Sequence, residues 1–105
     1  MQQFKCYQLA VQFYQQAKGR KLPGHLHNQL IRAASSVALN LCEGWGRGIS
    51  KDRKRFWKIA LGSIRECEAV VSLEPQAFTI EQRNLLNHLA AATNKLIRNA
   101  PTSPP

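Results

Sequence analysis

Four stretches of this chain repeat their apolar residues with a period close to 3.6, and short segments containing glycine or proline separate them. The stretches span residues 3–18, 23–43, 50–73 and 79–98, and no window alternates with the period of two that marks a strand. Four helices joined by short loops pack most simply as an antiparallel up-down-up-down bundle. The sequence therefore predicts an all-α fold, with one domain over residues 1–98 and a flexible proline-rich tail over residues 99–105.

Local signals mark several helix ends. Ser50 is a favourable N-cap for the third helix, and Thr79 followed by Gln82 forms a capping box for the fourth. Pro23 suits the first turn of the second helix, and the glycines of residues 44–48 can adopt the left-handed conformation that ends it. These signals predict where the chain turns.

The charge balance is strongly basic. Fifteen lysines and arginines against six acidic residues give a net charge of +9. Such an excess attracts polyanions, which makes nucleic acid, an anionic membrane surface or an acidic protein the candidate partners. No apolar run is long enough to span a membrane, and the N-terminus does not resemble a signal peptide. We therefore expect a cytoplasmic protein without a membrane partner.

The three cysteines are odd in number and widely spaced, with no C-x-x-C pair. A disulfide framework or a zinc site is therefore not expected. All three fall on the apolar side of a predicted helix, which predicts buried free thiols. They are Cys6, Cys42 and Cys67.

The third helix carries the best organised basic residues. Five of them fall within about 100° on a helical wheel and form one stripe: Lys51, Lys54, Arg55, Lys58 and Arg65. Like charges at these spacings repel, so an uncompensated stripe makes sense where phosphates neutralise it. Arg47, in the glycine-rich turn before this helix, and the loop residues Lys18, Arg20 and Lys21 are expected to assist.

The aromatic residues near the stripe have other roles to fill. Helical spacing places Phe56, Trp57 and Ile59 in the core. Trp45 lies in the glycine-rich turn, where it either stacks on a base or caps the end of the bundle. Gly62 lies beside the stripe inside a helix, and packing by a neighbouring helix explains it better than the approach of a ligand.

The first helix has more apolar surface than one bundle position requires. One stripe, made by Phe4, Tyr7, Val11 and Tyr14, lies beside a second apolar stripe on the same helix. Either other subunits cover the surplus or the helix is deeply wrapped by its neighbours, and patch size favours oligomerisation. Leu39, on the polar side of the second helix, is a further candidate interface residue.

No arrangement of residues predicts catalysis. The three histidines have no carboxylate at metal-ligand spacing, and no nucleophile pairs with a base. Glu66 and Glu68 point to different faces of one helix, and Glu66 is better placed for a polar contact near Ser63. We therefore expect a protein that is not an enzyme and that holds no metal or cofactor.

Residues 32–69, RAASSVALNLCEGWGRGISKDRKRFWKIALGSIRECEA, resemble the signature of the four-helix-bundle proteins encoded in intervening sequences of bacterial 23S ribosomal RNA. The family pattern has a serine, an asparagine one turn later, then AEG-x-GR, RF and A-x-GS-x-x-E-x-E. The departures are Ala38, where the family often has proline, and Cys42, which replaces an alanine. The matching residues are Ser36, Asn40, Glu43, Gly44, Gly46, Arg47, Arg55, Phe56, Ala60, Gly62, Ser63, Glu66 and Glu68.

The resemblance implies an antiparallel four-helix bundle with relatives that form ring-like homopentamers. It also implies similarity to the accessory variability protein of diversity-generating retroelements, a basic pentamer that works with a reverse transcriptase and binds nucleic acid. It implies no catalytic residues. The matched polar residues could instead serve a structural network between the second and third helices, namely Asn40, Glu43, Arg47, Arg55 and Glu66.

Three hypotheses follow. The leading one is a cytoplasmic homo-oligomer, expected to be a pentamer, that binds RNA or a DNA–RNA hybrid as an accessory factor to a retroelement reverse transcriptase. The second is an adaptor that docks an acidic protein without nucleic acid, and the third is a ribosomal RNA intervening-sequence protein with no retroelement role. Genomic context separates the first from the third.

Overall fold

The computed structural model describes residues 2–101 and contains four α-helices and one short 3-10 helix. The α-helices are α1 (Gln2–Ala17), α2 (Gly24–Gly46), α3 (Lys51–Leu73) and α4 (Ile80–Asn99), and the 3-10 helix η1 (Pro75–Ala77) precedes α4. This part of the chain contains no strand. The all-α prediction is confirmed, and the main boundary difference is that α2 continues to Gly46. Residues 102–105 of the expected tail lie outside the described residues.

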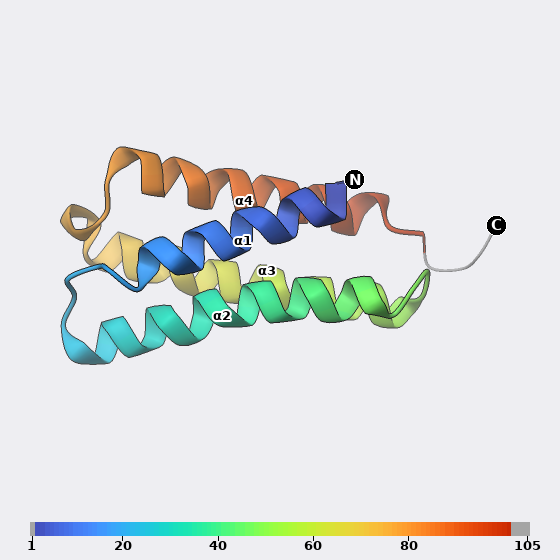
Figure 1. Ribbon diagram of the computed structural model, residues 1–105, viewed down its shortest axis with the longest axis horizontal. Helices are drawn as coiled ribbons and strands as arrows, with labels where there is room; N and C mark the ends of the chain where they lie inside the picture. The colour runs from blue at the N-terminus through green and yellow to red at the C-terminus, as the bar shows by residue number, and fades with distance from the viewer. Residues whose placement is uncertain (1, 102–105) are drawn as a thin grey trace.

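The four α-helices lie side by side along the long axis of a molecule that measures 47 × 23 × 18 Å (Figure 1). Each helix packs against two others, in the cyclic order α1, α2, α3, α4. The turn between α2 and α3 lies at one end of the bundle, together with the start of α1 and the end of α4 (Figure 1). The α1–α2 connection and η1 lie at the opposite end, so residues of the two loops are separated by most of the length of the molecule.

The predicted helix starts at Ser50 and Thr79 are confirmed. The Ser50 hydroxyl accepts from the Arg53 backbone N–H at 3.1 Å, and Asp52 lies in the first turn of α3. Thr79 and Gln82 form the reciprocal capping box, with bonds of 3.1 and 2.9 Å. Pro23 is the N-cap of α2 rather than its first residue. These caps satisfy backbone N–H groups that a helix leaves unpaired.

The core draws aliphatic, aromatic and small side chains from all four helices. Small side chains on the inner face of α2, such as Ala33 and Ala34, are buried and let neighbouring helices approach closely. Cys6 and Thr93 share the core, where Sγ and Oγ1 are 3.2 Å apart, so the buried hydroxyl has a partner. The largest fully buried side chains are Phe13, Leu30, Ile64 and Leu89.

A short polar seam joins α2 to α3. The hydroxyl oxygens of Ser36 and Ser63 are 2.8 Å apart, and the Asn40 amide donates to the Ser36 carbonyl at 2.9 Å and to its hydroxyl at 3.1 Å. Asn40 therefore takes the structural role considered for it. Glu66 does not, because its side chain is exposed and no hydrogen bond to it occurs within residues 2–101.

Three residues predicted in the core or buried lie nearer the surface. Ile59 is 41% exposed, Cys42 is exposed, and Phe56 is half-buried. Ile59 and Cys42 stand at or beyond the margin of the apolar arc of their helices, which accounts for their exposure. The placement of Trp57 in the core is confirmed. No helix among the described residues combines the length and apolar content that a membrane crossing needs.

Candidate nucleic-acid interface

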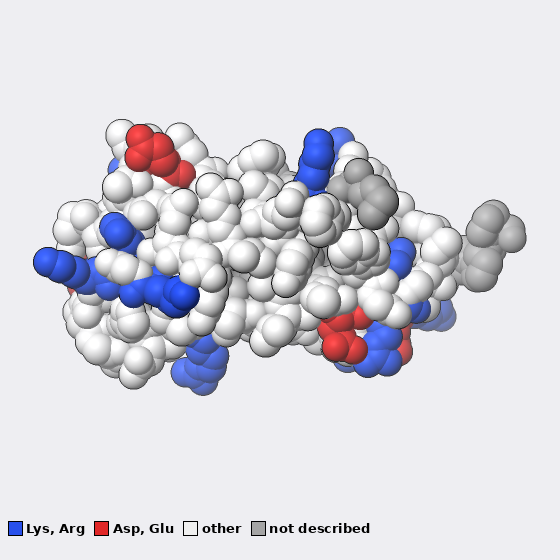
Figure 2. Space-filling view, in the orientation of Figure 1, with Lys and Arg blue, Asp and Glu red and all other residues white. Residues whose placement is uncertain are grey.

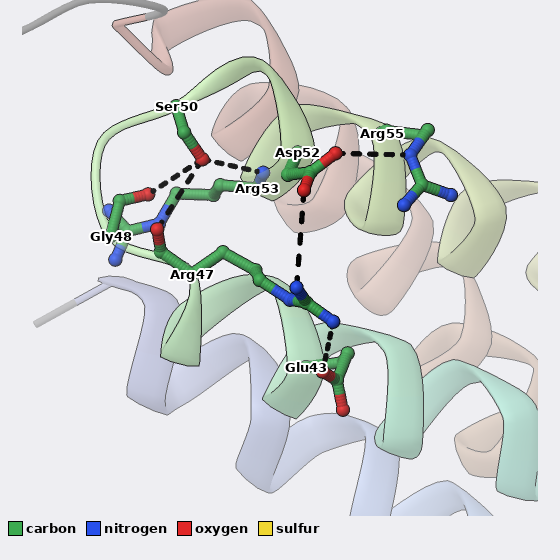
Figure 3. Close-up of polar contacts among 7 residues, drawn as sticks. All are labelled: Glu43, Arg47, Gly48, Ser50, Asp52, Arg53 and Arg55. Carbon is green, nitrogen blue, oxygen red and sulfur yellow. Dashed lines mark hydrogen bonds and ion pairs between the residues drawn. The ribbon is translucent and has the colours of Figure 1, made fainter.

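The turn between α2 and α3 positions the start of the basic helix. Arg47 follows the last residue of α2 as its C-cap, in a right-handed conformation, and Gly48 comes next with a φ of 67°. An L side chain rarely adopts this conformation, so a glycine is favoured immediately after the helix. The chain then passes through Ile49 to the Ser50 cap and reverses into α3 (Figure 3).

Gly44 allows the close contact between the two helices at this turn. A Cβ atom at Gly44 would stand 2.5 Å from Nε1 of Trp57 and 2.9 Å from the carbonyl oxygen of Arg53. Trp57 is 2% exposed, and its indole N–H donates to the Leu41 carbonyl of α2 at 3.2 Å. Gly44 therefore serves packing, and it fixes the beginning of α3 against the end of α2.

Arg53 holds the same junction, a role that the helical pattern did not predict. Its Nε donates to the Gly44 carbonyl at 3.1 Å and its Nη2 to the Trp45 carbonyl at 2.9 Å, while its guanidinium lies 5.3 Å from the Trp57 ring centroid. The last carbonyls of a helix lack intrahelical partners and carry partial negative charge, so a cation is stabilising there. One feature of the sequence does point to this role of Arg53. Helical spacing places Arg53 on the core side of α3, where an arginine needs a polar partner.

Ion pairs link four exposed charged side chains at this junction, as Figure 3 shows: Glu43, Arg47, Asp52 and Arg55. Arg47 lies 2.9 Å from Glu43 and 4.0 Å from Asp52, and Arg55 lies 3.4 Å from the same Asp52. The guanidinium carbons of the two arginines are 4.9 and 4.5 Å from the centroid of the Phe56 ring. Two cations and two carboxylates cancel, so this cluster carries no net charge.

The stripe on α3 is accordingly only partly uncompensated. Arg55 pairs with Asp52, and Arg65 pairs with Glu68 at 2.8 Å. Within residues 2–101 no carboxylate lies in ion-pair range of the remaining three cations of the stripe, which are Lys51, Lys54 and Lys58. The expectation of a fully unpaired stripe is therefore wrong for its arginines, because carboxylates one helical turn away reach them. These exposed pairs are each worth about 1 kcal/mol or less, so a phosphate can compete with the carboxylates.

Six residues spaced alternately four and three apart form one exposed line along α3, which we call the α3 row. The α3 row consists of Lys51, Arg55, Lys58, Gly62, Arg65 and Ala69. Gly62 interrupts the cationic part of this row, and glycine inside a helix costs about 1 kcal/mol relative to alanine. A Cβ atom at Gly62 would meet nothing within 4 Å, so packing by a neighbouring helix in residues 2–101 does not explain the glycine.

The loop between α1 and α2 does not join this surface. It lies at the opposite end of the bundle, where Figure 2 shows basic side chains gathered apart from those near the α2–α3 turn. Arg20 donates to the carbonyls of Gln16 and Ala77 at 3.3 Å, and the Lys18 ammonium lies 5.2 Å from the Tyr14 ring centroid. Lys21 is exposed. The nine predicted contact residues therefore form two separate groups.

The surface over α1 and α2 has the opposite character. Residues 6–17 and 33–42 include no charged side chain, and Figure 2 shows an uncharged area in the middle of this face. In the predicted stripe on α1, Phe4 is 43% exposed, whereas Tyr7, Val11 and Tyr14 are half-buried. Leu39 on α2 is 68% exposed. Helices of the same chain thus leave part of this apolar surface uncovered.

Trp45 belongs to the end of the bundle. It lies in the last turn of α2 and is half-buried, with its ring centroid 5.8 Å from that of Phe4 at an interplanar angle of 58°. This tilted geometry is favourable for an aromatic pair. The pair closes the bundle between the start of α1 and the end of α2, which is the capping role considered for Trp45.

The thiols differ in environment. Burial raises the pKa of Cys67 to about 12, with a smaller contribution from the charges of Glu66 and Glu68. Burial also raises the pKa of Cys6, although its contact with Thr93 opposes the shift. Both thiols are therefore protonated at neutral pH. All three cysteines are free, and no three His, Cys, Asp or Glu side chains gather as metal ligands among the described residues.

The fold and these surfaces define a basic four-helix-bundle protein with one cationic helix face and one uncharged face over α1 and α2. The family model described as 23S rRNA-intervening sequence protein matches residues 2–99, and the chain belongs to this family. The resemblance drawn from residues 32–69 is thereby confirmed at the level of the family. No curated protein and no solved structure matches the chain.

Proposed function

We propose that this chain is a non-enzymatic cytoplasmic protein that assembles into a homo-oligomeric ring and binds nucleic acid through the cationic face of α3. The bundle has the antiparallel up-down-up-down order, and the ring is a pentamer. The ligand is RNA or a DNA–RNA hybrid, bound mainly through its phosphates. Binding of this kind depends only weakly on the nucleotide sequence, because contacts to phosphates position a protein on the nucleic acid without reading its bases.

The observation that supports the proposal most is the set of three unpaired lysines on α3. Lys51, Lys54 and Lys58 lie one turn apart, where like charges destabilise a helix by a few tenths of a kcal/mol per pair. Among residues 2–101, carboxylates compensate the neighbouring arginines but not these lysines. Phosphates would supply the missing charges and would release condensed counterions on binding.

The uncharged face over α1 and α2 supports the assembly. Contact between copies through the stripe on α1 and through Leu39 would cover apolar surface that the single chain leaves exposed. A ring presents one α3 face per subunit. Several weak phosphate sites on one particle then act together, because each contact after the first is effectively intramolecular.

Fluorescence anisotropy with labelled RNA, a DNA–RNA hybrid and a labelled poly-glutamate peptide tests the proposal. The expected result is binding to both nucleic acids at moderate salt, little difference between unrelated sequences of equal length, and weaker binding of the peptide. Equal or tighter binding of poly-glutamate, or no binding of either nucleic acid, would refute the nucleic-acid role. Mass measurement by light scattering tests the pentamer separately.

A second function, docking of an acidic protein, is favoured by a groove between α1 and α4. Its lining includes the cations Lys5 and Lys95, together with His88, around an apolar floor that includes Leu9 and Ala92. Its lining contains no acidic residue. A pull-down performed with and without nuclease separates the two functions, because a partner bound in this groove survives digestion and one bridged by nucleic acid does not.

The cellular role proposed for the complex is assistance to a retroelement reverse transcriptase. The alternative is a role tied to a ribosomal RNA intervening sequence, with which the family assignment agrees. A reverse transcriptase gene and a template repeat beside the coding sequence would support the first role. A surrounding ribosomal RNA operon would support the second and contradict the first.

A further inference from the structure

Gly62 is the central residue of α3, and it is exposed at the middle of the α3 row. Lys58 precedes it by one turn and Arg65 follows it by one turn, each about 5–6 Å away between neighbouring side-chain positions. Two long cationic side chains therefore flank a site where the helix backbone is bare. No other helix of this chain fills the space, because a Cβ atom there would have no neighbour within 4 Å.

Nothing in the described part of the chain requires a glycine at this position. Gly48 needs its left-handed backbone, and Gly44 needs the space taken by Trp57. Gly62 has neither reason, since Gly48 is the only glycine with a positive φ among residues 2–101 and the space at Gly62 is open. Alanine would fit and would favour the helix. A helix-breaking residue that the fold does not need points to a contact outside the chain.

The surrounding charges indicate which contact it is. The α3 row brings Lys51, Arg55 and Lys58 to one side of Gly62 and Arg65 to the other. The same face of a second copy would bring like charges together, whereas a phosphate backbone complements them. Glu66, one turn beyond Gly62, is the acidic group nearest to it in sequence. Its charge repels an anionic strand from the side of the α3 row on which Glu66 lies.

We propose that Gly62 is the point at which the sugar–phosphate backbone of a bound nucleic acid comes closest to α3. This inference rests on the proposed function and specifies how it is achieved. The strand crosses α3 between Lys58 and Arg65, and each of these cations contacts a phosphate on its own side. Glu68 holds the Arg65 guanidinium at 2.8 Å, which orients it along the helix surface. A side chain at position 62 would keep the strand away from both cations.

Two substitutions test the proposal without changing charge: Gly62→Ala and Gly62→Gln. Both residues favour a helix more than glycine does, so both variants should unfold at a higher temperature than the wild type. Binding to the DNA–RNA hybrid should weaken about threefold with alanine and about tenfold or more with glutamine, a difference that reflects side-chain size. Asn87→Ala and Asn87→Gln, at an exposed position of α4, are matched controls that should leave binding unchanged.

The outcomes separate this proposal from the function on which it rests. Failure of the wild type to bind nucleic acid refutes the proposed function itself. Binding by the wild type and equal binding by Gly62→Gln refutes the close approach at Gly62 while the function stands. A changed oligomeric mass of Gly62→Gln in light scattering would make Gly62 a contact between subunits and would also refute the proposal.

Discussion

Replacement of Gly44 by alanine is the sharpest test of how the α2–α3 junction is built. The added methyl group would stand 2.5 Å from Nε1 and 2.6 Å from Cδ1 of Trp57, and 2.9 Å from the carbonyl oxygen of Arg53. The indole is fully enclosed and the other neighbour is backbone, so neither can move aside cheaply. The expected result is displacement of Trp57 and loss of its hydrogen bond to Leu41.

The magnitude follows from three contributions. Overpacking a core costs about 1–3 kcal/mol, and the lost hydrogen bond costs about 0.5–1.5 kcal/mol. Alanine recovers up to about 1 kcal/mol through its helix propensity. The free energy of unfolding should therefore fall by about 0.5–3.5 kcal/mol. In a domain of this size each kcal/mol shifts the melting temperature by about 4–8 °C, so Gly44→Ala should melt roughly 2–28 °C lower than the wild type.

Gly46→Ala is the matched control, because Gly46 lies two residues later in the same helix and a Cβ atom there meets nothing within 4 Å. Thermal unfolding followed by circular dichroism should show Gly46→Ala melting at or above the wild-type temperature. Tryptophan fluorescence should report the displaced indole in Gly44→Ala alone. Equal melting temperatures for the two variants would refute the packing role assigned to Gly44.

Four further predictions concern charge and thiols. Replacing the three unpaired lysines together by glutamine should lower the salt dependence of nucleic-acid binding by about 2–3 in the log–log slope, and an unchanged slope would contradict their contact with phosphate. Glu66→Gln should tighten binding because it removes an anion beside the row, and weaker binding would contradict this placement. In the native protein a thiol reagent at pH 8 should modify Cys42 alone, with all three cysteines reacting after denaturation; rapid reaction of Cys67 in the folded state would contradict its burial. Since the folded pKa of Cys67, about 12, exceeds its ordinary value of 9.0, its contribution to stability should persist below about pH 9 and decline above it.

Local sequence signals predicted the helices well. The caps at Ser50 and Thr79 depend on residues only three positions apart, so the sequence alone defines them. The central position of Trp57 also followed from helical spacing. The end of α2 was harder to place, because Gly44 and Gly46 read as helix breakers although the helix continues through both and ends before Gly48. The glycine at which a helix ends depends on how the following helix packs against it.

The charged residues were predicted less well, and the reason is geometric. The contact of Arg47 with Asp52 spans a turn whose shape the sequence does not define, and Arg53 reaches back to carbonyls of the preceding helix. A helical wheel gives the direction of a side chain but not the partners that a neighbouring helix brings to it. The same limit applies to Gly62, since only the packed structure shows that no other helix covers it.

The most direct measurement of the central claim is the salt dependence of binding by the wild-type protein. The affinity for a DNA–RNA hybrid of about 20 base pairs, long enough to cover the roughly 21 Å from Lys51 to Arg65, is measured across a series of salt concentrations. Per subunit engaged, the log–log slope should be about −2 to −3 if the three lysines alone contact phosphate. It should approach about −4 to −5 if the paired arginines also exchange carboxylate for phosphate. An affinity that does not change with salt would contradict phosphate binding by α3.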